Sequence, residues 1–151
     1  MKKSIVLIAL LLACFGIKAI ADGPDVCFVK TADKVYFGQD VKMGLIHTKI
    51  ISSDGTIAKV KTQQVTSYMH DGKLYDLLPL ICPTGDTLCY NFMEYLTSRS
   101  DLKLYRYKCC ESREVVYVYF VYKDGKLYLR VNQYNAESIL PFFGIKNVAI
   151  I

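Results

Sequence analysis

The feature that most constrains the fold is an unbroken run of β-forming residues, Val-Val-Tyr-Val-Tyr-Phe-Val-Tyr, at positions 115–122. β-Branched and aromatic side chains favour strands because they pack well on a pleated surface. The run is followed by Asp124-Gly125, a pair that suits a two-residue hairpin turn because both central positions need positive φ. A second apolar stretch, 126–131, comes next. The sequence therefore predicts an antiparallel hairpin with strands at 115–123 and 126–131.

Similar signals extend over the rest of the chain. Turn clusters at Ser52-Ser53-Asp54-Gly55 and His70-Asp71-Gly72 separate stretches that are rich in Val, Ile and Thr. The further expected strands are 26–30, 35–37, 41–51, 56–69, 73–78 and 102–109. We expect an α+β fold with a mainly antiparallel sheet of about six to seven strands.

Two helices are expected beside this sheet. Asp86 or Thr87 can cap the first, at about 86–98, where Leu88, Phe92, Tyr95, Leu96 and Arg99 recur at spacings of three and four. A short C-terminal helix is expected from Asn135, as its cap, through Leu140, where Pro141 would stop it.

The first twenty-one residues resemble an export signal. Lys2 and Lys3 precede an apolar run from Ser4 to Ile17, and Ala19-Ile20-Ala21 offers the small-x-small pattern that a signal peptidase cuts after. We therefore expect residues 1–21 to be a signal peptide and 22–151 a single globular domain. Its expected location is the periplasm or the cell surface.

A second interpretation of the leader stays open. Leu11-Leu12-Ala13-Cys14 is similar to a lipoprotein signal, in which the cysteine is lipidated and becomes the new N-terminus. Lipidation of Cys14 would anchor the protein to a membrane. The polar tether expected after such a cysteine is absent, because Phe15-Gly16-Ile17 continues the apolar run. Contact with a membrane is expected only if Cys14 is lipidated.

The charge balance argues against nucleic acid as a partner. Of the 19 basic residues, Lys2, Lys3 and Lys18 lie in the leader, which leaves 16 against 14 acidic residues. Nucleic-acid-binding domains carry a concentrated excess of positive charge. We therefore expect a protein partner, and the oligomeric state stays open.

Five of the six cysteines follow the leader: Cys27, Cys82, Cys89, Cys109 and Cys110. In an oxidising compartment they could form disulfides, but an odd number leaves at least one without a bridge inside the chain. Cys82 and Cys89 flank the turn-forming Pro83-Thr84-Gly85 and are the best candidates for a disulfide that closes a small loop. The alternative is that they are buried thiols that act as small apolar side chains.

Catalytic and metal-binding patterns are weak. Nucleophilic catalysis by a thiol would need a neighbouring base, and only His47 and His70 could supply an imidazole. The cysteine spacings do not match zinc motifs, and the carboxylates are scattered. We expect no catalytic residues, no metal and no cofactor.

Tyrosine is the one unusual component, with 12 tyrosines and no tryptophan. Alternation along a strand places Tyr105 and Tyr107 on one face of the 102–109 strand, and Tyr117 and Tyr119 on one face of the 115–123 strand. If these strands pair, the four could form a single binding patch, since tyrosine is enriched in recognition surfaces. The alternative is that cross-strand aromatic pairs stabilise a covered sheet.

The C-terminal half resembles small exported proteins of unknown function from Gram-negative bacteria of the Bacteroidota type. The resemblance rests on Leu-Lys-Leu-Tyr-Arg-Tyr at 102–107, Tyr-Phe-Val-Tyr-Lys-Asp-Gly-Lys-Leu-Tyr at 119–128 and Leu-Pro-Phe-Phe-Gly at 140–144. It implies a periplasmic or outer-surface location and no activity.

These observations favour an exported, non-catalytic binding or interaction domain, for example an inhibitor or an immunity-type protein. A lipid-anchored structural protein of the envelope and an enzyme of unfamiliar type are the alternatives.

Overall fold

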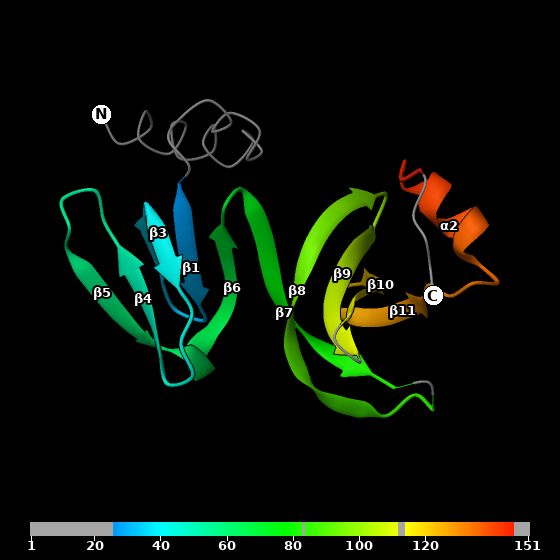
Figure 1. Ribbon diagram of the computed structural model, residues 1–151, viewed down its shortest axis with the longest axis horizontal. Helices are drawn as coiled ribbons and strands as arrows, with labels where there is room; N and C mark the ends of the chain where they lie inside the picture. The colour runs from blue at the N-terminus through cyan, green and yellow to red at the C-terminus, as the bar shows by residue number, and fades with distance from the viewer. Residues whose placement is uncertain (1–25, 83, 112–113, 147–151) are drawn as a thin grey trace, which may run out of the picture.

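The computed structural model describes residues 26–82, 84–111 and 114–146. Within these ranges the chain forms eleven strands in two antiparallel sheets (Figure 1). The larger sheet has the order β11-β10-β9-β8-β7-β6-β1-β2, and the smaller has the order β3-β4-β5. Their bounds are β1 Cys27–Thr31, β2 Val35–Gly38, β3 Asp40–Lys42, β4 His47–Ile51, β5 Ile57–Lys61, β6 Val65–His70, β7 Lys73–Ile81, β8 Thr87–Arg99, β9 Leu102–Glu111, β10 Glu114–Lys123 and β11 Lys126–Arg130.

The expected mainly antiparallel sheet with a C-terminal helix is confirmed, but six to seven strands was too few. Two stretches expected as single strands are each divided. The stretch 41–51 holds part of β3 and all of β4, and 56–69 holds β5 and most of β6. A short 3-10 helix, η2 (Thr62–Gln64), separates β5 from β6 and carries the chain from the small sheet to the large one.

The N-terminal half is a small two-sheet unit in which the β3-β4-β5 sheet packs against β1, β2 and β6 (Figure 1). Its core consists of small, mainly aliphatic side chains: Cys27, Val29, Val41, Ile50, Val60 and Val65. The sheets approach closely at Gly38, where a Cβ atom would lie 2.6 Å from both Ile50 Cγ2 and the Ile51 carbonyl oxygen. A side chain larger than hydrogen would push the sheets apart at this point.

The two Asp-Gly hairpins form as predicted. His70 pairs with Lys73 and Lys123 with Lys126, so each loop has two residues. Asp71 and Gly72 have φ values of 50° and 67°, and Asp124 and Gly125 have 49° and 75°. Positive φ at both central positions is the signature of the turn that matches the twist of an antiparallel pair.

The expected helix at 86–98 is wrong, because Thr87–Arg99 form β8, the longest strand at 13 residues. Apolar residues three and four positions apart, such as Leu88, Phe92 and Tyr95, also occur in a strand when parts of both of its faces are buried. β8 pairs with β7 along most of its length and with β9 over its second half. Ladder pairing with β7 along the first part of β8 and with β9 along the second part outweighs the helical spacing, since the residues are themselves good strand formers. The expected cap residue Thr87 is the first residue of the strand.

Strong curvature of β7–β11 creates a second core on the inside of the curl. β8 carries two bulges, which give it an extra residue at Leu88 and at Leu96 relative to its neighbours. Bulges bend a strand and increase its twist. The curl brings β10 across to β7, where the Tyr122 hydroxyl donates to the Pro79 carbonyl oxygen at 2.6 Å. The residues enclosed are Leu78, Met93, Tyr105, Phe120 and Tyr122.

The outer face of this curl is partly covered by α2 (Ala136–Phe142) (Figure 1). Leu140 and Phe143 pack there against side chains of β9 and β10, among them Leu104, Tyr119 and Val121. Pro141 lies inside the helix rather than ending it. Asn135 holds the N-cap position without a capping hydrogen bond from its side chain, which instead donates to the Arg130 carbonyl oxygen.

The expected leader, residues 1–21, and Cys14 lie outside the described residues. Within the described part, none of the helices combines the length and apolar character needed to cross a bilayer.

Candidate binding surface

The register of β9 and β10 divides the four predicted tyrosines between two faces. Tyr105 lies opposite Phe120 and Tyr107 opposite Val118, whereas Tyr119 lies opposite Arg106. Directly opposed residues point to the same side of a sheet. Tyr105 and Tyr107 therefore face the inside of the curl, and Tyr117 and Tyr119 face the outside. The predicted single patch of four tyrosines is wrong, because a one-residue change of register moves a whole set of side chains to the other face.

Tyr105 is part of the inner core, with 2% of its surface exposed. Its hydroxyl donates to Asp76 Oδ2 at 2.7 Å, and its ring packs edge-on against Tyr95 and Tyr122. Burial and the hydrogen bond to Asp76 raise the pKa of Tyr105. Tyr107, half-buried beside this core, accepts a hydrogen bond from Asn91 Nδ2 at 3.0 Å. Both tyrosines hold the curl together.

On the outer face, Tyr119 and Tyr117 differ in exposure. Tyr119 is 5% exposed and belongs to the cluster beneath α2. Tyr117 is 40% exposed, and the Arg106 guanidinium lies over its ring, 4.4 Å from the centroid. Of the four predicted residues, only Tyr117 combines an exposed aromatic surface with a charged neighbour.

Arg106 is anchored by Glu94 on the adjacent strand. Arg106 Nη2 lies 2.8 Å from Glu94 Oε1 and 2.7 Å from Oε2, while Nε donates to Oε2 at 3.2 Å. Burial acts to lower the pKa of Arg106, but the hydrogen bonds and the charge of Glu94 raise it overall. The guanidinium is therefore a permanently charged group held in a fixed orientation.

The ion pair belongs to a row of residues that crosses the sheet from β6 to β10. In register order the row is Tyr68, Tyr75, Glu94, Arg106 and Tyr119. The rings of Tyr68 and Tyr75 stack with centroids 4.7 Å apart. Burial first, and then the neighbouring Tyr75, raise the pKa of Tyr68 to about 12. We call this row together with Tyr117 the tyrosine–arginine face.

Sequence reasoning missed Tyr75, Glu94 and Arg106. The signal that could have found them is opposite charge on two neighbouring strands, with Glu94 paired to Arg106 across the sheet. The mistaken helix at 86–98 concealed it, because a helical Glu94 has no cross-strand partner.

The predicted disulfide between Cys82 and Cys89 is not formed, and both are free thiols. The register places Cys89 opposite Leu80, not opposite Cys82. Cys82 lies in the loop between β7 and β8, where its Sγ is 2.8 Å from Thr84 Oγ1. The hydrogen bond with Thr84 lowers the pKa of Cys82.

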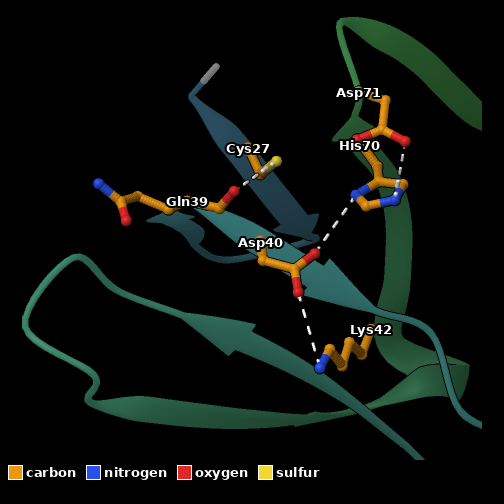
Figure 2. Close-up of polar contacts among 6 residues, drawn as sticks. All are labelled: Cys27, Gln39, Asp40, Lys42, His70 and Asp71. Atoms are coloured by element: carbon orange, nitrogen blue, oxygen red, sulfur yellow. Dashed lines mark hydrogen bonds and ion pairs between the residues drawn. The ribbon is translucent and has the colours of Figure 1, made fainter. Parts of the chain in front are cut away.

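A second polar cluster lies where the two sheets meet (Figure 2). His70, the last residue of β6, has Nδ1 3.6 Å from Asp40 Oδ1 and Nε2 3.3 Å from Asp71 Oδ2. The carboxylates therefore lie at opposite sides of the ring, so they cannot share one metal ion with it. No group of three or more metal-ligating side chains was found among the described residues.

The cluster also does not form an accessible thiol–imidazole pair. Phe28 pairs with Met69, so Cys27 and His70 are their respective chain neighbours. The thiol of Cys27 donates to the Gln39 carbonyl oxygen at 3.3 Å (Figure 2), and the residue is 3% exposed. Catalysis by a thiolate needs a thiol that a substrate can reach. The arrangement fits a structural contact in which His70 and Asp40 link β6 to β3.

Comparison with known proteins gives no relative: neither a family model, nor a curated protein, nor a solved structure matches this chain.

Proposed function

We propose that the chain is an exported, non-catalytic binding domain that engages a protein partner through the exposed Tyr117 end of the tyrosine–arginine face. The observation that carries the proposal is the exposed Tyr117 ring stacked on Arg106, which Glu94 fixes in place. Tyrosine and arginine are among the residue types enriched at the positions that contribute most to affinity in protein interfaces.

The surroundings of Tyr117 support this function. Val115, two residues away on the same face of β10, is 50% exposed, and Lys108 is the cross-strand partner of Tyr117. An apolar centre with a polar rim is typical of a protein-binding surface. Glu94 already holds the Arg106 side chain in one orientation. Arg106 therefore loses little conformational entropy when a partner binds.

A photo-crosslinking experiment tests the proposed surface. The full chain is expressed in its source cell with a photoreactive phenylalanine analogue in place of Tyr117, and the same analogue in place of Tyr128 serves as the matched control. Tyr128 is also an exposed strand tyrosine, on β11. We expect one discrete protein adduct from position 117 and none from position 128. No adduct at 117, or identical adducts at both positions, would contradict the proposal.

The export part of the proposal has its own measurement. The intact mass of the protein recovered from the cell envelope should correspond to residues 22–151, or to a chain that begins at a lipidated Cys14. Recovery of the full-length chain from the cytoplasm would contradict export without bearing on the binding surface.

A further inference from the structure

The β7–β8 hairpin extends beyond the rest of the sheet and leaves one side of β8 without a neighbouring strand (Figure 1). β7 pairs with β8 from Glu94 to Thr87. On the other side β9 pairs only with Glu94–Arg99. Within the described chain, residues Thr87–Met93 therefore have a strand on one side only. We call this stretch the free edge of β8.

The outer part of the free edge is open to solvent. Asn91 still reaches Tyr107 by a hydrogen bond, so β8 and β9 remain close at that point. From Tyr90 back to Thr87 every residue is exposed, with Leu88 at 64% and Tyr90 at 66%. An open strand edge presents backbone N–H and C=O groups to any strand that can pair with it.

The free edge of β8 lacks the features that protect the other edges. Its sequence, Thr-Leu-Cys-Tyr-Asn-Phe-Met, has no charged residue and no proline. By contrast, β11 begins with Lys126 and ends with Arg130, β5 carries Lys59 and Lys61, and β3 and β2 are only three and four residues long. Charge and short length are the usual means by which proteins prevent edge-to-edge association.

We propose that two copies of the chain pair through the free edge of β8, antiparallel about a twofold axis close to Cys89 and Tyr90. A second copy suits this edge because a twofold axis places β8 of one copy beside β8 of the other. An uncharged strand meets no like charge in that arrangement, whereas β11 or β5 would place lysines or arginines close together. The alternation is also self-complementary, since Tyr90 and Phe92 share one face in both copies.

The expected dimer is weak. Only Thr87–Tyr90 of the free edge are exposed, and four strand residues span about 13 Å. A strand pair of this length alone is small beside the ~1,200–2,000 Å² buried in stable complexes. We therefore expect an equilibrium between monomer and dimer that depends on protein concentration.

Sedimentation velocity of the purified, exported chain over a range of concentrations tests the proposal. The average mass should rise from that of one chain toward that of two. Tyr90→Lys places two ammonium groups near the axis and should weaken association at least about tenfold, equivalent to about 1.4 kcal/mol. Tyr128→Lys is the matched control, because Tyr128 is similarly exposed (64%) but lies on β11. It should leave association unchanged, and circular dichroism should show both variants folded.

The free Cys89 thiol provides a second measurement. A short bis-maleimide should link two chains through Cys89, and Cys89→Ser should abolish the linked dimer while Cys82→Ser retains it. A single-chain mass at every concentration up to about 1 mM, or equal effects of Tyr90→Lys and Tyr128→Lys, would overturn the proposal. A monomer that still gives the adduct at position 117 would overturn self-association and leave the proposed binding function intact.

Discussion

The two halves of the molecule build their cores from different side chains. The core of the N-terminal half, between the small sheet and β1, β2 and β6, consists of aliphatic residues and one cysteine. The inner core of the C-terminal half, inside the curl of β7–β11, contains Tyr105, Phe120 and Tyr122. Sheets that approach as closely as these do at Gly38 suit short branched side chains, whereas the curled sheet encloses aromatic rings.

The difference also concerns hydrogen bonding. A buried hydroxyl without a hydrogen-bond partner is costly. Both fully buried tyrosines of the inner core have such a partner. Tyr105 donates to Asp76, and Tyr122 donates to the Pro79 carbonyl oxygen. These bonds join strands that are not neighbours in the sheet, so they specify how tightly it curls. In the N-terminal core the thiol of Cys27 donates to the Gln39 carbonyl oxygen, but the other members of the cluster are aliphatic, so the stability of this core should depend mainly on packing volume.

The largest effect is expected from Tyr122→Ala. Tyr122 is 1% exposed, and its removal leaves a cavity and the Pro79 carbonyl oxygen without its donor. Large-to-small replacement of a buried aromatic residue costs about 3–5 kcal/mol. Urea denaturation monitored by circular dichroism should show this loss in the free energy of unfolding. A loss below about 1 kcal/mol would mean that Tyr122 does not hold the curl closed.

A somewhat smaller effect should follow from alkaline pH. Burial raises the pKa of Tyr122 to about 12, whereas an unfolded tyrosine titrates near 10. Between pH 10 and 12 the unfolded chain loses this proton and the folded chain keeps it. The contribution of Tyr122 is therefore complete below pH 10 and is lost as the pH rises to 12, by about 2–3 kcal/mol.

Urea denaturation at a series of pH values measures this loss. Tyr122→Phe, which cannot ionise, should show a shallower decline than the wild type between pH 10 and 12. Identical slopes in the two proteins would contradict the assignment. Tyr68, whose pKa is also raised to about 12, should contribute to the slope that remains in the variant.

The smallest effect is expected in the aliphatic core. Ile50 is 1% exposed and packs where the two sheets approach at Gly38. Ile50→Val removes one methylene group and should cost about 0.5–1.5 kcal/mol, again measured by urea denaturation. A loss as large as that of Tyr122→Ala would show that the two cores do not differ in the way proposed.

Features that depend on neighbouring residues could be predicted from the sequence, whereas features that depend on contacts between distant residues could not. The turns at Asp71-Gly72 and Asp124-Gly125 were predicted correctly, since positive φ is a local preference of these residues. The strands 102–109, 115–123 and 126–131 agree with β9, β10 and β11 within two residues at each end. The helix at 86–98 was wrong, because the pairing of β8 depends on β7 and β9.

The candidate site was predicted only in part for the same reason. Tyr117 was identified by residue type and strand alternation, and it lies on the proposed surface. Its partner Arg106 and the anchoring Glu94 were not identified, since their contact requires the register of three strands. Tyr105 was assigned to the same patch, but the register turns it into the core.

By itself, the sequence determined the β-rich character of this protein, its two Asp-Gly hairpins and the position of its C-terminal helix, because φ preferences and side-chain shape act within a few residues. Only the tertiary structure decided that 87–99 is a strand, that the four tyrosines are divided between two faces, and that β8 keeps a free edge. These outcomes depend on register and curvature, which arise from backbone hydrogen bonds and packing between strands that meet only after the chain has folded.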